Sequence, residues 1–151
     1  MAMKMAGEFV LPADRATVWA RLNDAETLKV SIPGCESLEK LSDTELQAVA
    51  KIKIGPVSAR FKGKVNLTDM DPPNSYRISG QGDGGIAGFA KGGANVRLDD
   101  AAGGGTRLSY DVDAQIGGKI AQLGGRLIDS TAKKLADEFF ANFAKALGGA
   151  A

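Results

Sequence analysis

The hydrophobic pattern of the chain changes its period once, close to the C-terminal end. From Cys35 to Ile116, apolar and polar residues alternate along successive runs, which is typical of strands with one face in solvent. After Gly117 and Gly118 the apolar spacing becomes helical and predicts one long amphipathic helix over residues 119–147. A helix of this length needs an apolar surface to pack on. The pattern therefore predicts an α+β fold, in which a curved antiparallel sheet wraps around a single C-terminal helix.

Turn and cap residues predict the remaining elements. A first strand over residues 3–11 ends at Pro12, and Asp14 is a suitable N-cap for the short helix that follows. A second short helix over residues 25–30 stops before Pro33. Short connections between the later strands favour a seven-stranded antiparallel meander. Its six further strands are predicted over residues 35–41, 45–54, 57–69, 75–82, 90–99 and 106–116.

The sheet face that should meet the long helix carries many small residues. Since protein interiors pack to nearly crystal density, either the helix lies close against the sheet or a ligand fills a hole. We favour a largely apolar cavity of about 300 to 1,000 Å³, the usual range for ligand pockets. Its predicted lining is Ile52, Ile54, Val57, Ala59, Phe61, Gly63, Tyr76, Ile78, Gly80, Ile86, Phe89, Ala94, Tyr110, Leu123, Leu127 and Ile128.

Two of these residues, Ile86 and Phe89, lie in a glycine-rich loop over residues 83–93. An ordinary surface loop would expose both side chains, whereas a lid over an apolar cavity would bury them. Residues 80–85 also spell G-x-G-x-x-G, but they follow an antiparallel strand and do not lead into a helix. This segment is therefore interpreted as a structural bulge or loop rather than as a nucleotide-binding motif.

A group of cations is predicted on the outer face of two neighbouring strands. Neither strand places a carboxylate among them, so the group is either a solvated face that discourages edge aggregation or a docking patch. An anionic phospholipid surface or an acidic enzyme would suit such a patch. Nucleic acid is not expected because aromatic residues are not interleaved with the cations. We call these residues the basic patch: Lys51, Lys53, Arg60, Lys62 and Lys64.

The composition narrows the chemistry. The 151 residues fit a single domain over 1–151 with a net charge of +1, and there is no histidine. Cys35 is the single cysteine, so no internal disulfide or CxxC site can form. No metal site and no catalytic residue is predicted. Because Glu8 interrupts the N-terminal region too early for a secretory signal, a cytoplasmic protein is expected.

Several separated motifs resemble the CoxG family of carbon monoxide dehydrogenase subunits, within the START-like, or SRPBCC, superfamily. They are Ile32-Pro33-Gly34-Cys35-Glu36, Gly55-Pro56-Val57, Phe61-Lys62-Gly63, Asp71-Pro72-Pro73, Gly88-Phe89-Ala90-Lys91-Gly92 and the run from Gly117 to Gly124. The resemblance implies the helix-grip fold, also called Bet v 1-like, with two short helices after the first strand. It further implies a non-catalytic accessory protein of a molybdenum-containing carbon monoxide dehydrogenase that binds an isoprenoid quinone, with no covalently bound cofactor. The resemblance also implies that some family members carry a hydrophobic C-terminal tail. Residues 147–151 of this chain are Leu-Gly-Gly-Ala-Ala, so we expect peripheral association with the inner face of the cytoplasmic membrane rather than permanent anchoring.

Two alternatives to a hydrophobic-ligand carrier remain open at this point. START-like folds also host cyclases and dehydratases, which need an acid or base inside the cavity. On the predicted inward strand positions only Tyr76 and Tyr110 carry a protic group, because Asp111 and Asp113 fall on the outer face. The other alternative is a structural adaptor whose core is filled.

Overall fold

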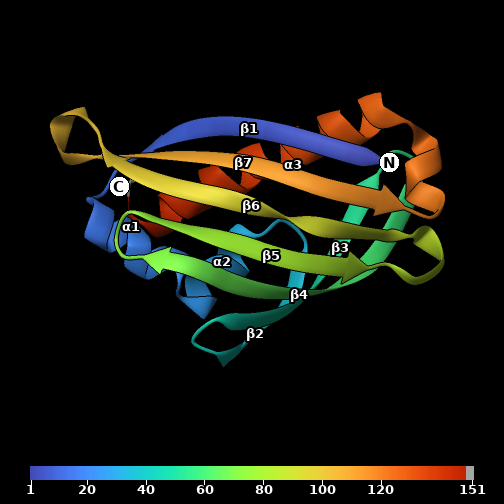
Figure 1. Cartoon of the computed structure of the whole chain (residues 1–151), viewed down its shortest axis with the longest axis horizontal. Helices are drawn as coiled ribbons and strands as arrows, with labels where there is room; N and C mark the ends of the chain where they lie inside the picture. The colour runs from blue at the N-terminus through green and yellow to red at the C-terminus, as the bar shows by residue number, and fades with distance from the viewer. Residues whose placement is uncertain (149–151) are drawn as a thin grey trace.

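The computed structural model describes residues 1–148, and the C-terminal residues 149–151, on which part of the tail expectation falls, lie outside the described residues. One seven-stranded antiparallel sheet, in the order β1-β7-β6-β5-β4-β3-β2, curves around the last helix (Figure 1). The strands are β1 (Ala2–Leu11), β2 (Cys35–Ser42), β3 (Glu45–Ile54), β4 (Val57–Asp71), β5 (Ser75–Asp83), β6 (Phe89–Asp100) and β7 (Thr106–Gly117). The predicted helix-grip architecture is confirmed.

The helices are α1 (Arg15–Leu22), α2 (Ala25–Ser31) and α3 (Gly125–Ala146), with short 3-10 turns η1 (Gly85–Ala87), η2 (Ala102–Gly104) and η3 (Lys119–Leu123). The predicted C-terminal helix is thus divided. Gly118 and Gly124 have φ angles of 80° and 95°, in the left-handed region that favours glycine, so residues 119–123 form a separate turn before α3 begins.

Side-chain caps and one partly buried hydrogen bond to α3 fix the two short helices. Asp14 accepts a hydrogen bond from the amide of Thr17 (2.9 Å) and starts α1, and Asp24 accepts one from the amide of Thr27 (3.1 Å) and starts α2. Asn142 Nδ2 of α3 donates to the carbonyl of Ser31 at the end of α2 (3.1 Å). These contacts hold α2 against α3 and so set the width of the interior beneath both helices.

The interior contains two apolar clusters, one toward each end of the molecule. The first lies near α1 and α2, at the left of Figure 1, and includes Leu22, Leu46, Tyr76, Leu108 and Phe143. The second lies at the opposite end, where the β3–β4 turn, η1 and η3 meet, and we call this region the loop end. Its buried members are Met3, Ile54, Ala87, Ile116, Ile120 and Ile128.

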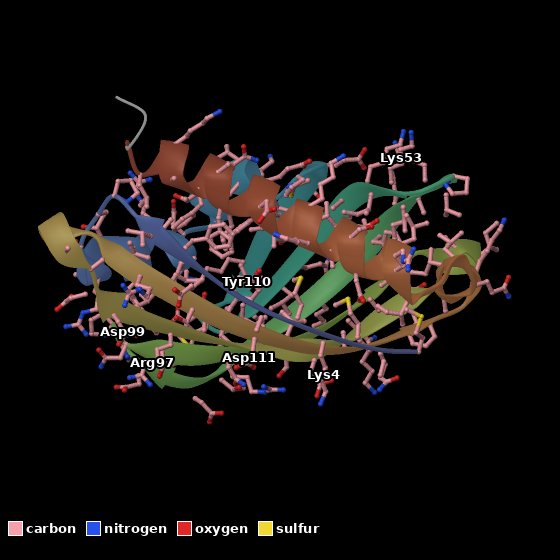
Figure 2. All side chains as sticks on the ribbon, turned by 90° about the horizontal axis from the view of Figure 1, so that it is seen from above. Lys4, Lys53, Arg97, Asp99, Tyr110 and Asp111 are labelled. Atoms are coloured by element: carbon pink, nitrogen blue, oxygen red, sulfur yellow. The ribbon has the colours of Figure 1, made fainter. Side chains whose placement is uncertain are left out.

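The sheet has an inner face toward α3 and an outer face toward solvent. Seen from above, Tyr110 lies between α3 and the sheet, whereas Lys4, Arg97, Asp99 and Asp111 point away from the helix (Figure 2). The register agrees with this alternation, because Tyr110 is paired with Gly7 and Asp111 with Ala6 along β1 and β7. A binding site on the inner face would therefore be apolar, whereas one on the outer face would be lined by charged side chains.

Candidate functional site

An apolar cavity of about 240 Å³ lies between α3 and the sheet, beside α1 and α2. Helical and strand residues both contribute to it: α3 covers it with two phenylalanines, and strands β2 to β7 supply the floor. Its volume is just below the range of about 300 to 1,000 Å³ expected for a ligand pocket. The lining residues are Leu22, Leu28, Ile32, Leu38, Leu46, Ala48, Val65, Leu67, Tyr76, Ile78, Val96, Leu108, Phe139 and Phe140.

Stacked aromatic rings hold the roof of the cavity in place. Phe140 stacks on Phe9 of β1 with ring centroids 4.3 Å apart, and Phe139 meets Phe140 edge to face at 5.0 Å. Phe139 also stacks with the fully buried Phe143 at 5.9 Å. Aromatic pairs at these separations stabilise one another beyond the area that they bury. The rings over the cavity are thus fixed by neighbours outside it and do not collapse into the hole.

Tyr76 alone among the described lining residues carries a polar side-chain atom. It is 6% exposed, and its ring meets the edge of Trp19 at a centroid distance of 5.2 Å. No hydrogen bond of its hydroxyl is found within residues 1–148, and the oxygen does not belong to the fully buried unpaired side-chain atoms of these residues, where Asn23 Oδ1 is the one found. Burial raises the pKa of the Tyr76 phenol, so the group is a protonated hydrogen-bond donor at neutral pH. The cavity therefore offers an apolar volume and one free donor.

Tyr110, the second predicted phenol, lies outside this lining. Its ring crosses over Gly7, where a Cβ atom would come within 2.8 Å of the Tyr110 hydroxyl oxygen, and it stacks with Phe9 and Phe140. Partial burial raises its pKa, and the Asp137 carboxylate raises it further. Tyr110 thus supports the aromatic roof from the β1 side and does not face the ligand volume.

Most of the other predicted cavity residues lie elsewhere in the interior. Ile78 lines the cavity together with Tyr76, while a second group belongs to the apolar cluster of the loop end. There α3 lies close to the β3–β4 turn, since a Cβ atom at Gly55 would come within 2.7 Å of Leu127 Cδ2. The loop before η1 lies close to β4, since a Cβ atom at Gly84 would come within 2.6 Å of Phe61 Cε1. The residues packed at the loop end are Ile52, Ile54, Val57, Ala59, Phe61, Leu123, Leu127 and Ile128.

Both interpretations of the small inward residues therefore apply, at different ends of the same sheet. Near the loop end the helix packs closely on the strands, and near α1 and α2 a hole remains. Gly63, Gly80 and Ala94 occupy inner strand positions and do not belong to the lining of the 240 Å³ cavity. The sequence argument missed the lining residues from α1, α2 and α3 and most of those from the strands. The i, i+4 spacing of Val18 and Leu22 on one side of α1 could have indicated that this helix faces the interior.

The expectation that Ile86 and Phe89 close a cavity is corrected by their positions. Ile86 is 94% exposed, and Phe89 is 46% exposed with its ring against Gly117. Phe89 pairs with Asp83 and Gly117 on the outer face, because the next residue, Ala90, points inward. The buried residue of this segment is Ala87. The side chains predicted to cover a ligand face solvent instead.

The basic patch occupies the outer face of β3 and β4, as the alternation indicates. All five side chains are exposed, and Lys51 is paired with Arg60 across the two strands. Carboxylates reach the patch from neighbouring strands: Glu36 Oε1 lies 2.8 Å from Arg60 Nε, and Asp83 is opposite Lys62. Figure 2 shows Lys53 pointing away from the sheet near the loop end. The five residues form one surface, and its role as a docking site remains a prediction.

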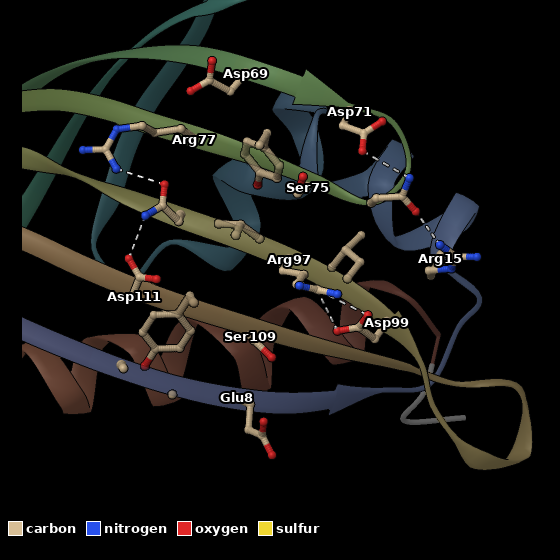
Figure 3. A pocket seen from close by; sticks show the side chains of 18 residues that line it. Glu8, Arg15, Asp69, Asp71, Ser75, Arg77, Arg97, Asp99, Ser109 and Asp111 are labelled. Carbon is tan, nitrogen blue, oxygen red and sulfur yellow. Dashed lines mark hydrogen bonds and ion pairs between the residues drawn. The ribbon is translucent and has the colours of Figure 1, made fainter.

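A wider groove of about 980 Å³ runs over the outer face of β1 and β4 to β7 (Figure 3). Its arginines are already engaged by neighbours. Arg77 donates to Asn95 Oδ1 (3.0 Å), whose amide in turn donates to Asp111 (2.9 Å), and Arg97 lies 3.3 Å from Asp99. The groove is open and lined largely by charged and polar side chains, so the apolar cavity is the stronger candidate for binding a hydrophobic molecule.

Neither a metal cluster nor a membrane-spanning helix is found in the part of the chain that the structure describes. Across residues 1–148 there is no group of three acidic or cysteine side chains placed to hold a metal ion. Within the same residues, none of the helices is long and apolar enough to cross a membrane.

The chain is similar to one known protein family and to several solved structures. The sequence model of the carbon monoxide dehydrogenase CoxG subunit family matches residues 7–148. A solved structure of a conserved protein from Geobacillus kaustophilus is 30% identical, with a TM-score of 0.91, and the alignment covers 97% of this chain and 96% of that one. No curated protein matches the sequence.

More distant structures share the fold. A START superfamily protein from Mycobacterium smegmatis is 13% identical with a TM-score of 0.73 over 98% of this chain and 99% of that one. The Zhui aromatase/cyclase from Streptomyces sp. R1128 is 10% identical with a TM-score of 0.71 over 98% and 94% of the two chains. At these identities the likeness is one of fold alone.

Proposed function

The chain belongs to the CoxG family of carbon monoxide dehydrogenase subunits, and from this premise we propose that it is a non-catalytic accessory protein that holds a hydrophobic molecule for the dehydrogenase. The observation that carries the proposal is the apolar cavity with a single free donor, the Tyr76 hydroxyl. A ligand with an apolar ring and a carbonyl oxygen matches both features, since the carbonyl accepts the hydrogen bond that the phenol otherwise lacks. A quinone has this chemistry.

The size of the cavity limits how such a ligand is held. About 240 Å³ accommodates a ring system and a short part of a tail, so a long isoprenoid chain must leave the cavity or widen it. Leu28 of α2 and Ile32, which follows its last residue, line the cavity at the side where α2 packs on α3, and the Asn142–Ser31 hydrogen bond is one of the contacts between the two helices. We place the route for the tail between α2 and α3.

The surface supplies the second half of the proposal. The basic patch is suited to an acidic face of the dehydrogenase or to anionic phospholipid, and the protein would then work at the inner face of the cytoplasmic membrane as a peripheral protein. In this function it links the enzyme to the membrane and carries the quinone between them.

Native mass spectrometry of the purified protein, followed by solvent extraction and ultraviolet spectroscopy of the extract, tests the proposal. We expect a bound adduct whose extract has a quinone absorption that disappears on reduction. Protein that is free of adduct and that takes up no added quinone would contradict the carrier function and favour an adaptor role.

A cyclase or dehydratase is the competing function, and the Tyr76 phenol is the group that it would have to use as its acid. Turnover measurements on variants of this residue separate the two functions, because a carrier needs the hydroxyl for binding alone.

A further inference from the structure

The loop end presents apolar side chains to solvent. Ile86 in η1 is 94% exposed, and Phe89 at the start of β6 is 46% exposed. A single exposed apolar residue is common and needs no explanation. These two residues differ from scattered surface residues because the backbone around Ile86 is fixed by hydrogen bonds and the neighbouring segments carry cations.

The segment that carries Ile86 is tightly fixed. Asp83 Oδ1 accepts a hydrogen bond from the amide of Gly85 (2.8 Å), and the amide of Gly84 donates to the carbonyl of Gly88 (2.8 Å). Ala87 is buried in the apolar cluster beside Ile120, and Gly88 packs directly on the backbone of Gly117, leaving no room for a Cβ atom. Because Ala87 is the buried residue of this closed turn, Ile86 faces solvent. The turn, which joins β5 to β6, lies at one end of the molecule (Figure 1).

The segments that meet at this end carry several cations. Phe89 covers Gly117, two residues before Lys119, and Lys91 lies two residues along β6 on the same outer face. The three described segments that meet at this end, residues 51–64, 83–91 and 115–123, contain one carboxylate, Asp83, whose side chain accepts a hydrogen bond from Gly85. A second carboxylate reaches this surface from β2, where Glu36 is paired with Arg60 at 2.8 Å. The cations that they carry are Lys51, Lys53, Arg60, Lys62, Lys64, Lys91 and Lys119.

We propose that the loop end is the surface by which the protein lies on an anionic lipid bilayer, with Ile86 inserted at the boundary of headgroups and acyl chains. Phe89 then lies at headgroup level, and the cations contact lipid phosphates. This rests on the proposed function for the presence of a membrane, and it names the surface and the residues that make the contact. Peripheral proteins bind bilayers through such a combination of apolar insertion and attraction of cations to anionic lipids.

A protein partner fits this surface less well. Stable protein interfaces bury a contiguous apolar core surrounded by a polar rim. Here one rigid isoleucine projects from a glycine-rich turn, and a Cβ atom at the adjacent Gly85 would have no neighbour within 4 Å. A projecting side chain at an end of the molecule whose segments carry several lysines suits a fluid surface that closes around it.

Vesicle co-sedimentation tests the contact. The full chain should bind vesicles of phosphatidylcholine with phosphatidylglycerol and bind pure phosphatidylcholine weakly. Ile86→Asp should lower the partition coefficient onto the mixed vesicles by about tenfold or more, because an isoleucine is no longer buried in lipid. Val10→Asp is the matched control, since Val10 is 66% exposed and lies near the C-terminal end of β1, at the end of the molecule away from the loop end. Ile86 makes no core contact, so both variants should fold like the wild type.

Insertion itself is measured with Ile86→Trp and vesicles that contain brominated lipid. We expect the fluorescence of the introduced tryptophan to shift to the blue and to be quenched, with wild-type protein correcting for Trp19. The proposal is overturned if the wild type does not bind anionic vesicles, or if Ile86→Asp binds them as well as Val10→Asp does. It is also overturned if brominated lipid does not quench the introduced tryptophan, or if Ile86→Asp binds vesicles normally and loses only its binding to the dehydrogenase.

Ligand retention on the same variants separates this proposal from the carrier function. Ile86 does not line the cavity, so Ile86→Asp should keep the adduct seen in wild-type protein. Absence of any adduct together with a large effect of Ile86→Asp on vesicle binding would contradict the carrier function and leave the membrane surface supported. If Ile86→Asp keeps the adduct and binds vesicles like the wild type, the carrier function is supported and the membrane surface proposed here is contradicted.

Discussion

The ring of Phe140 stacks on the ring of Phe9 with centroids 4.3 Å apart, and this contact joins α3 to β1 along the edge of the apolar cavity. Phe9 lies outside the cavity lining and Phe140 within it. The pair therefore fixes the height of α3 over the sheet at the place where the hole remains. Without it, the helix could settle toward the strands, as it does at the loop end.

The first prediction concerns this roof. Phe140→Ala should lower the free energy of unfolding by roughly 2 to 4 kcal/mol, because a large, mostly buried ring and its stacking partners are lost. Phe89→Ala is the matched control and should change stability by less than about 1 kcal/mol, since Phe89 lies on the outer surface. Urea unfolding followed by circular dichroism measures both. Equal losses would mean that the stack does not support the roof.

The second prediction locates the hole by overpacking. Ala48 lines the cavity, so Ala48→Leu should be accommodated in it, leave the free energy of unfolding nearly unchanged and reduce hydrophobic-ligand uptake. Ala59 is packed in the cluster at the loop end, and Ala59→Leu should destabilise the fold by about 1 to 3 kcal/mol. Thermal unfolding and ligand uptake of the two variants give the comparison. The reverse order of stability would place the unfilled volume at the loop end.

Alternation in the sequence was sufficient to predict the sheet, but not the position of the hole. Ala48 and Ala59 are both small and both inward-facing on adjacent strands, so the two look equivalent in one dimension. What distinguishes them is the path of the C-terminal segment. Gly118 and Gly124 break the predicted helix, and the turn between them buries Ile120 beside the strands at the loop end.

The outward position of Phe89 could have been predicted from the sequence. Ala90 begins an alternating run whose apolar members face α3, which already places Phe89 on the opposite face. The exposure of Ile86 could not, because η1 has no alternation, and its direction depends on the packing of Gly88 against Gly117 and on the burial of Ala87.

The third prediction concerns the basic patch. Replacing Lys51, Lys53, Arg60 and Lys62 by Glu should weaken association with the dehydrogenase or with anionic liposomes, and wild-type association should fade as salt rises because exposed charges are screened. Replacing four exposed cations outside the patch, Arg97, Arg107, Lys134 and Lys145, by Glu is the control, because it lowers the net charge by the same amount. Sedimentation at about 0.05 and 0.5 M salt measures the effect. Binding that is insensitive to both salt and the four substitutions would return the patch to a simple solvated face.

The fourth prediction uses the titration of Tyr76. An unfolded tyrosine has a pKa of about 10, and burial raises the folded value above this. As pH rises above 10 the unfolded chain releases this proton before the folded chain does, so the folded state becomes less stable with rising pH. Below pH 10 both states keep the proton and this group contributes no pH dependence.

Urea unfolding at pH 8 to about 11 should therefore show stability decreasing above pH 10 by up to about 1.4 kcal/mol per pH unit from this one group. Tyr76→Phe should remove most of the decrease. Tyr110→Phe should remove less, because Tyr110 is only partly buried. If the two variants had the same pH profile as the wild type, the Tyr76 phenol would not be buried in the folded state.

The fifth prediction separates a carrier from an enzyme at the same hydroxyl. In a carrier, Tyr76→Phe removes one hydrogen bond to a ligand carbonyl and should weaken quinone binding by about 0.5 to 1.5 kcal/mol, or roughly two- to tenfold. The fold should tolerate the change, since the hydroxyl makes no hydrogen bond within residues 1–148. Tyr110→Phe should leave quinone binding unchanged, because that hydroxyl lies over Gly7 and outside the cavity.

An enzyme that used the Tyr76 phenol as its acid would instead lose at least about a hundredfold in rate in the Tyr76→Phe variant. Quinone titration by fluorescence and turnover of a candidate cyclase substrate should be measured on both variants. A hundredfold loss of turnover in a Tyr76→Phe protein that still binds its ligand would replace the carrier assignment with an enzymatic one.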